Sequence, residues 1–310
     1  MKTGTIPRSG KVVADQERAG TTEALSRVRS RSAPVLAVVN RKGGAGKSSS
    51  AMNIAGVWGG WGLQVCLVDL DTAFNLTEAC GYPVELRTDG GDWLSTGHVE
   101  PWPVPTMPHC ALVPSGSRLA AGVERMERLA IDRERYLGKL LSPLRTTYDV
   151  LVLDTKPDLD LSVTGALAAA THVLAPALTL PQPLYGVVRS LGLVADLQEG
   201  LPDLRVVGFL PMAYNGKGLR PASLGSLVEM AAEYGVDCLP PIPFTDHAGK
   251  ESQSHTPAAL AYRNSPAGHA YRCVAALLGA SLGLAVPVEW LGRGRQAQAE
   301  MVREIMGGEG

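Results

Sequence analysis

The stretch Asn40–Ser49 holds the residue types that bind a phosphate group: glycines, two lysines and two serines. In a glycine-rich turn between a strand and a helix, several backbone N–H groups point at one anion at the helix N-terminus. In such a loop the Lys47 ammonium contacts the β- and γ-phosphates of a nucleotide, and the Ser48 hydroxyl binds Mg²⁺. The residues predicted to surround the phosphates are Gly43, Gly44, Ala45, Gly46, Lys47, Ser48 and Ser49.

The flanking residues are the elements that must position this loop. The apolar, β-branched run Val35–Val39 predicts a buried parallel strand, and Ala51–Ala55 predicts the start of a helix. A glycine-rich turn without a ligand is the alternative. The strand before the loop, the helix after it and the spacing of the two lysines favour the phosphate loop.

Carboxylates end two further predicted strands. The run 64–71 ends in Asp69 and Asp71, and the run 148–155 places Asp154 after four apolar residues. The carboxyl ends of parallel strands meet at the crevice where ligands bind, so these side chains are expected near the phosphate loop. Capping of a following helix is the alternative for Asp69 and Asp71.

The loop departs from the usual phosphate-loop pattern, because Arg41 replaces its first glycine and a second lysine, Lys42, follows. The resulting pattern, K-G-G-x-G-K-[ST], resembles the deviant Walker A box of the ParA/MinD family of P-loop ATPases. The resemblance implies an ATP- and Mg²⁺-dependent ATPase with slow basal hydrolysis that a partner stimulates. It also implies a homodimer that forms around two ATP molecules, in which Lys42 reaches the partner's phosphates.

The same resemblance assigns roles to other positions. Lys42, Lys47 and Asp71 would be catalytic, with Asp71 orienting the attacking water. Ser48 and Asp154 would hold Mg²⁺, and Pro243, in an Ile-Pro pair typical of the family, would lie near the adenine. Two positions depart from the family: the loop after Asp71 lacks the usual Pro, Gln and Gly, and Lys156 replaces a proline. We expect a solvated Lys156; a salt bridge to Asp158 or Asp160, or an altered switch region, is the alternative.

The order of the predicted elements indicates an α/β fold, a doubly wound and mainly parallel sheet of seven or eight strands flanked by helices. We expect a basic, flexible extension at 1–33, the ATPase domain at 34–286 and a short helical tail at 287–310. Within the domain we predict one charged helix over 118–141 and a short helix near 92–94, and the resemblance implies a dimer-face helix over 181–193.

Composition excludes several classes of protein. The net charge is −1, so affinity for nucleic acid must come from a local patch. Five scattered cysteines form no C-x-x-C pair, which indicates buried, reduced thiols rather than disulfides or a zinc site. No signal peptide is recognised, and the apolar run 273–288 is short for a membrane span. We expect a soluble, cytoplasmic protein, and the resemblance implies association with the nucleoid.

The family divides by what the dimer binds. A ParA-type partition ATPase, the closest being Soj-like, binds double-stranded DNA non-specifically and is released by a ParB-like adaptor, in plasmid partition or chromosome segregation. A MinD-like membrane switch needs a cationic amphipathic C-terminal helix, but residues 297–306 contain no aromatic residue and nearly balanced charges. A positioner of protein cargo shares the DNA chemistry, and an iron–sulfur relative would need bridging cysteines that Cys110 and Cys238 do not match. Candidate DNA contacts are Lys217, Arg220, Lys250, Arg263 and Arg272.

Overall fold

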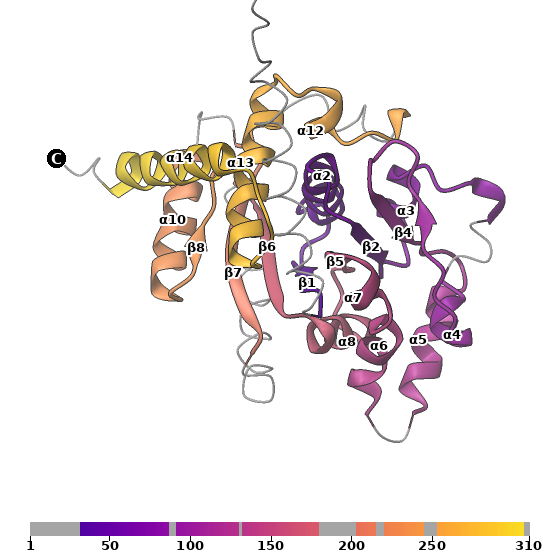
Figure 1. The fold of residues 1–310 in the computed structure, drawn as a ribbon. Coiled ribbons are helices and arrows are strands. Elements are labelled where there is room, and N and C mark those ends of the chain that lie inside the picture. The colour runs from indigo at the N-terminus through magenta and orange to yellow at the C-terminus, as the bar shows by residue number, and fades with distance from the viewer. Residues whose placement is uncertain are drawn as a thin grey trace, which may run out of the picture.

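The computed structural model describes residues 32–86, 91–129, 132–179, 203–214, 220–244 and 253–306. Its strands form one eight-stranded sheet in the order β3-β4-β2-β5-β1-β6-β7-β8 (Figure 1). Every pairing is parallel except that of the edge strand β3 with β4. The strands are β1 (Val35–Val38), β2 (Val65–Asp69), β3 (Trp102–Pro103), β4 (Cys110–Val113), β5 (Val150–Asp154), β6 (His172–Leu178), β7 (Arg205–Met212) and β8 (Asp237–Cys238).

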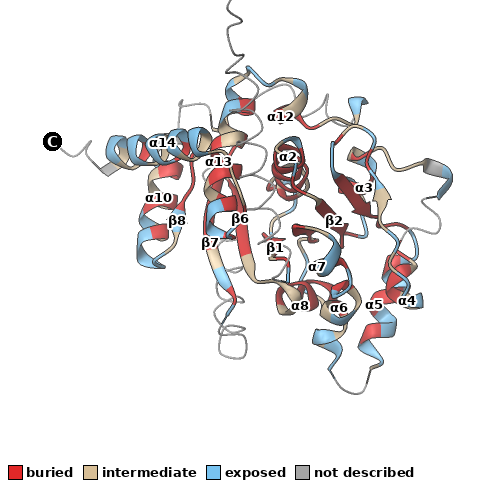
Figure 2. Ribbon diagram, in the orientation of Figure 1, coloured by how far each residue is buried: buried red, intermediate tan, exposed pale blue. Residues whose placement is uncertain are grey.

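Helices cover both faces of the sheet (Figures 1 and 2). In β1, Leu36 and Val38 belong to a core cluster with α2 and α13, whereas Val35 and Ala37 belong to a second cluster with α6 and α8. This alternation follows from the period of two in a strand, and it confirms the predicted doubly wound fold. The helices are α2 (Lys47–Gly60), α3 (Asn75–Ala79), α4 (Trp93–Thr96), α5 (Leu119–Glu127), α6 (Arg133–Leu141), α7 (Leu144–Thr147), α8 (Leu161–Ala169), α10 (Arg220–Glu233), α12 (Ala258–Ala261), α13 (Pro266–Ser281) and α14 (Val288–Met306), and a 3₁₀ turn spans Val84–Leu86.

The strand order brings the predicted site residues to one edge of the sheet. β5 lies between β1 and β2, and its last residue, Asp154, pairs with Val38 on one side and with Asp69 on the other. The loop after β1 and the carboxylates of β2 and β5 therefore share the carboxyl edge of three adjacent strands. The strand order reverses at this point, and open α/β sheets typically bind ligands where it does.

Two helix predictions were wrong in extent. The single helix predicted over 118–141 is two helices, α5 and α6, and Asp132 with φ 58° precedes the second. Asp tolerates this left-handed conformation, which the apolar period does not reveal. The C-terminal helix α14 spans 19 residues rather than forming a short helix. Its Met301, Val302 and Ile305 join a third core cluster with α10, which supports the added length.

Other predictions have mixed outcomes. The short helix predicted near 92–94 is α4. The helix predicted over 181–193 and the extension up to residue 31 lie outside the described residues. All five cysteines are buried and free, and the described residues contain no cluster of three or more His, Cys, Asp or Glu side chains that could hold a metal ion. No helix in the described ranges has the length and apolarity to cross a membrane.

Candidate functional site

The loop between β1 and α2 has the backbone shape of a phosphate loop. Gly44 and Gly46 adopt φ values of 70° and 89°, and α2 begins directly afterwards at Lys47. A Cβ on Gly46 would lie 2.8 Å from the Met212 Cε atom, the flexible end of that side chain, so it is the backbone conformation that requires glycine. The N-terminus of α2, with its free N–H groups, therefore opens toward this loop.

The loop borders a cavity of about 610 Å³. Residues 43–49 line it together with segments after β2 and β5. The charged side chains that line it are Lys47, Asp71, Lys156 and Asp158. Lys42 is not among the lining residues, although its carbonyl lies 3.5 Å from the Lys47 Nζ. The cavity thus brings together the loop residues and Asp71, as the sequence predicted, and adds Lys156 and Asp158.

A second cavity of about 210 Å³ adjoins the first, and Gly44, Gly46 and Ser49 line both. The rest of its wall is mainly apolar and includes Pro243 and Tyr271. This shape suits a flat heterocycle attached to the phosphates in the first cavity. Pro243, predicted near the adenine, lies in its wall.

Lys47 is the buried cation of the first cavity. Burial lowers the pKa of its ammonium, and the carboxylates of Asp154, Asp71 and Asp158 oppose that shift, in that order. These neighbouring carboxylates favour the charged form of Lys47, against the effect of burial. A charged lysine with little solvent around it interacts strongly with phosphate oxygens.

Asp69 positions Asp71 rather than facing the cavity. Its Oδ1 accepts the Asp71 N–H at 3.0 Å, and its Oδ2 accepts the backbone N–H and hydroxyl of Thr77 at 2.8 and 2.7 Å. Burial raises the pKa of Asp69 to about 6, although these hydrogen bonds oppose the shift. Phe74, which has no side-chain cap, is the N-cap residue of α3, but Asp69 accepts the Thr77 N–H in the first turn of that helix. The capping alternative is therefore supported for Asp69, whereas Asp71 accepts the Ala73 N–H before the helix begins.

Asp71 lies in the cavity wall and is held from two sides. Its Oδ1 accepts the Ala73 N–H at 2.9 Å, and its carbonyl accepts the Ser115 hydroxyl at 2.7 Å. The residue is 8% exposed and lines the cavity, while the chain around it is fixed. A fixed carboxylate beside a phosphate site is what orientation of an attacking water requires.

Asp154 satisfies a structural test for a cation site. Both of its carboxylate oxygens are buried and have no hydrogen-bond partner among the described residues. Its pKa lies well above the usual range, first because of burial and then because of Asp69; Ser48 and Lys47 lower it in part. An uncompensated buried carboxylate is costly, and a divalent cation held with the Ser48 hydroxyl removes that cost. The residues present therefore fit Mg²⁺.

The sequence did not identify Asn40 as a positioning residue. Its side-chain amide donates to the Pro176 carbonyl at 2.6 Å, and its Oδ1 accepts the Lys42 N–H at 2.8 Å. Asn40 thereby joins the phosphate loop to β6. Only its place directly after a buried strand could have signalled this role.

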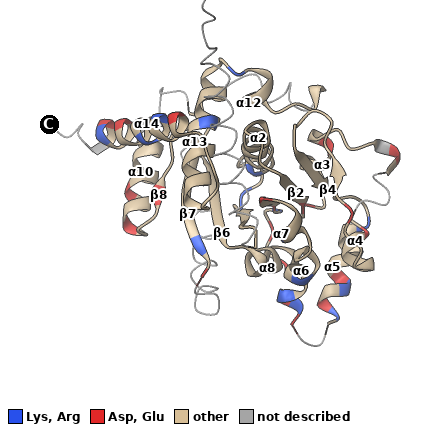
Figure 3. Ribbon diagram, in the orientation of Figure 1, with Lys and Arg blue, Asp and Glu red and all other residues tan. Residues whose placement is uncertain are grey.

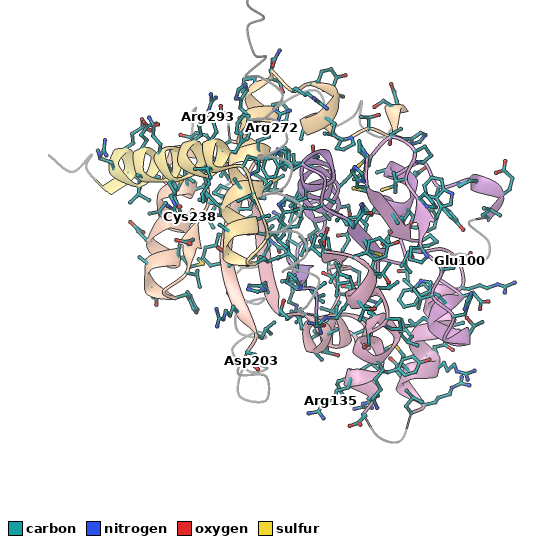
Figure 4. All side chains as sticks on the ribbon, viewed as in Figure 1. Glu100, Arg135, Asp203, Cys238, Arg272 and Arg293 are labelled. Atoms are coloured by element: carbon teal, nitrogen blue, oxygen red, sulfur yellow. The ribbon has the colours of Figure 1, made fainter. Side chains whose placement is uncertain are left out.

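The predicted DNA contacts differ in position. Lys217 and Lys250 lie outside the described residues, and for Arg220 only the backbone, at the start of α10, is described. Arg263 is exposed, whereas Arg272 donates to the carbonyls of residues 259, 263 and 268 and stacks 5.3 Å from the Trp290 ring centroid. Figure 4 labels Arg272 and Arg293 where α13 meets α14. This arrangement leaves less of the Arg272 guanidinium for a phosphate contact.

Known proteins are similar to this chain in sequence and in fold. A family model described as an AAA domain matches residues 33–203. The chromosome-partitioning ATPase Soj of Thermus thermophilus is 29% identical over 250 residues, which cover 77% of this chain and 93% of that protein. Soj of Treponema pallidum is 32% identical over 176 residues, which cover 56% of this chain and 68% of that protein.

Solved structures of related proteins have a similar fold. A cobyrinic acid a,c-diamide synthase from Mycobacterium smegmatis, crystallised with an ATP analogue and magnesium, has a TM-score of 0.67 at 28% identity, over 82% of this chain and 98% of that one. The septum site-determining protein MinD of Pyrococcus horikoshii, complexed with Mg-ADP, shares the fold, with a TM-score of 0.63 at 19% identity over 79% and 96% of the chains. The chain therefore belongs to this AAA-domain family, among the ParA/MinD P-loop ATPases that use ATP and Mg²⁺.

Proposed function

We propose that the protein is a ParA-type partition ATPase, whose ATP-bound homodimer binds DNA non-specifically and is released when a ParB-like adaptor stimulates hydrolysis. The observation that carries the proposal is the cavity in which the loop 43–49, Asp71 and Lys47 meet above a buried Asp154. Likeness to Soj over three quarters of the chain points to partition among the family's uses.

In hydrolysis, the loop N–H groups and the Lys47 ammonium neutralise charge on the transferred phosphoryl group. Asp71 orients the attacking water from the cavity wall. Asp69 and Ser115 hold Asp71 in that position through hydrogen bonds to its backbone. Ser48 and Asp154 would hold Mg²⁺, which would offset the negative charge of the phosphates. Pro243 and Tyr271 would border the adenine in the second cavity.

Lys42 is proposed to complete the site of a second copy. Its side chain does not line its own cavity, while its backbone is fixed by Asn40 at 2.8 Å. A lysine anchored beside the phosphate loop, with its ammonium outside the cavity, suits a contact to phosphates held by a partner. Such a contact would supply a positive charge in trans, as an arginine finger does.

A surface on α12, α13 and α14 is the proposed DNA contact within the described part of the chain. Arg263, Arg293 and Arg295 are exposed there, and Figure 3 shows that acidic residues also occur along α14. Contacts to DNA phosphates supply affinity without base specificity and weaken as salt rises. Lys217, Arg220 and Lys250 remain candidates from the sequence.

The structure offers an argument against the MinD-like alternative. A membrane-binding helix must expose its apolar face, but Met301 of α14 is buried and Val302 and Ile305 pack against the α10 cluster. Membrane binding would require these contacts to break.

The test is binding to a random-sequence DNA duplex, with ATP, ADP or no nucleotide, across a salt series. We expect binding only with ATP, and a loss of affinity that is linear in log salt. Arg263→Ala is expected to reduce that slope by about 1, the value for one phosphate contact. Arg135→Ala on α6, which removes an exposed cation far from this surface (Figure 4), is the matched control and should leave the slope unchanged. Binding to anionic vesicles but not to DNA would overturn the proposal.

A further inference from the structure

Lys156 is a cavity residue that the family's pattern does not provide. It lines the phosphate cavity. At this position of the sequence, the resemblance to the family implies proline. The side chain is 18% exposed and forms an ion pair with Asp160, which is 21% exposed. The expectation of a solvated lysine is therefore wrong, and the salt bridge to Asp160 is the alternative that the structure supports.

Asp160 uses its two oxygens for different purposes. Its Oδ1 caps α8, accepting the N–H groups of Ser162 and Val163 at 3.0 and 3.3 Å and the Ser162 hydroxyl at 2.6 Å. Its Oδ2 holds Lys156. The helix cap therefore does not depend on the lysine, and the lysine can leave without uncapping α8.

Among the described residues that line the cavity, Lys156 and Lys47 are the cations. Lys47 begins α2 and follows the glycines of the loop, whereas Lys156 comes from the segment after β5. Asp71 and Asp158 lie in the same wall. A nucleoside triphosphate brings one more phosphate group than a diphosphate, and hence more negative charge for a second cation to neutralise.

We propose that Lys156 is a second phosphate-binding lysine of the same subunit, held by Asp160 until the terminal phosphate of a nucleoside triphosphate displaces that carboxylate. Lys156 then selects triphosphate over diphosphate and links the nucleotide state to the segment before α8. The inference rests on the proposed phosphate cavity and deepens it. A half-buried lysine that exchanges one carboxylate for a more highly charged phosphate gains more than a solvated one, because less water competes.

The experiment measures the affinities of the full chain for ADP and for a non-hydrolysable ATP analogue, each with Mg²⁺. Lys156→Gln should weaken analogue binding about tenfold, as expected for one charge-assisted contact, and ADP binding less than about twofold. Lys156→Arg should keep much of the preference for the ATP analogue over ADP. Asp160→Asn keeps an oxygen for the cap but releases the lysine, so it should strengthen analogue binding several-fold.

The opposite signs of these two variants distinguish the proposal from a purely structural ion pair. If the pair only stabilised the fold, Lys156→Gln and Asp160→Asn would act in the same direction and leave the ratio of the two affinities unchanged, which would overturn the inference. In the double variant Lys156→Gln/Asp160→Asn, the gain in analogue affinity that Asp160→Asn causes alone should vanish. Lys139→Gln is the matched control, since Lys139 pairs with Asp132 on the surface, 66% and 47% exposed.

Failure of the inference can be told from failure of the proposed phosphate site. Lys47→Ala should abolish binding of both nucleotides. If the unaltered chain binds neither nucleotide, the phosphate site itself is wrong and the inference falls with it. If the chain binds both and Lys156→Gln keeps the unaltered ratio, only the role of Lys156 is wrong.

Discussion

Two buried carboxyl groups of this site differ in whether the protein itself satisfies their charge or a bound cation must do so. Asp69 and Asp154 are both fully buried and face each other as paired residues of β2 and β5. The pKa of each carboxyl lies above its ordinary value of 3.8, mainly because of burial. Asp69 has three donors to satisfy it, whereas Asp154 has none among the described residues. Asp154 is therefore the residue whose charge costs stability until a cation binds.

This cost predicts that Asp154→Asn stabilises the metal-free protein. A carboxyl with a raised folded pKa contributes stability at low pH, and that contribution is lost as pH rises through the folded pKa. Asparagine does not ionise, so at pH 7 the variant should gain about 1–2 kcal/mol in free energy of unfolding, a usual size for stabilising changes. The measurement is urea unfolding with a chelator at pH 7 and at pH 4.

Two results would contradict this prediction: a variant less stable than the unaltered protein at pH 7, or an advantage that grows on acidification. The advantage should shrink toward pH 4, where the unaltered carboxyl is protonated in the folded state. Adding Mg²⁺ with nucleotide should stabilise the unaltered protein more than the variant, since only the former keeps the carboxylate ligand.

At the scale of elements, the phosphate loop is shaped by packing from distant parts of the chain. Met212 at the end of β7 lies against Gly46, and Asn40 ties the loop to β6. Asn53 of α2 donates to the Ser49 carbonyl and accepts the Ala259 N–H at 2.8 Å, which joins α2 to α12. The loop conformation is thus fixed before any ligand binds, which reduces the entropy lost on binding.

Two glycines of the same loop should therefore respond differently to alanine. Gly46→Ala forces a side chain into a left-handed conformation and should destabilise the fold by about 1–2 kcal/mol, while the flexible end of Met212 can move aside. Gly43 has no positive φ, and no atom within 4 Å of an added Cβ, so Gly43→Ala should change stability by less than about 1 kcal/mol. Equal unfolding midpoints in denaturant for the two variants would refute this account of the loop.

At the scale of the whole molecule, the described cavity is built by one subunit but contains only one lysine of the loop. Lys47 lines it and Lys42 does not. If Lys42 serves the partner's site, nucleotide binding and dimer formation are separable steps. Each subunit would bind ATP with its own residues, and the dimer would form around the bound phosphates.

Lys42→Ala should therefore bind the ATP analogue within about threefold of the unaltered affinity but lose at least tenfold in dimer affinity, the loss of one charge-assisted contact. Light scattering after size exclusion, with the analogue and Mg²⁺, gives the dimer fraction. Arg41→Ala removes a neighbouring exposed cation of the same loop and is the matched control. Equal loss in both variants would mean that the total charge of the loop matters, rather than Lys42 itself.

Short sequence patterns were enough to predict the local parts of this protein. The glycine spacing of residues 43–46, the lysines and the apolar runs before Asp69 and Asp154 are patterns of a few residues, and they predicted the loop, the buried strands and the parallel α/β fold. Such patterns are readable because a tight turn or a strand buried on both faces restricts the residue types at neighbouring positions.

The distant residues that serve the site could be identified only once the chain was folded. Asn40 meets Pro176 and Gly46 meets Met212 through strand order, and no local pattern encodes contacts over 136 or more positions. The turn at Asp132 that separates α5 from α6 leaves the apolar period almost unchanged, and the length of α14 depends on packing against α10. Lys156 shows the difference most directly: its sequence favoured a solvated charge, but the fold places it in the phosphate cavity beside Asp160.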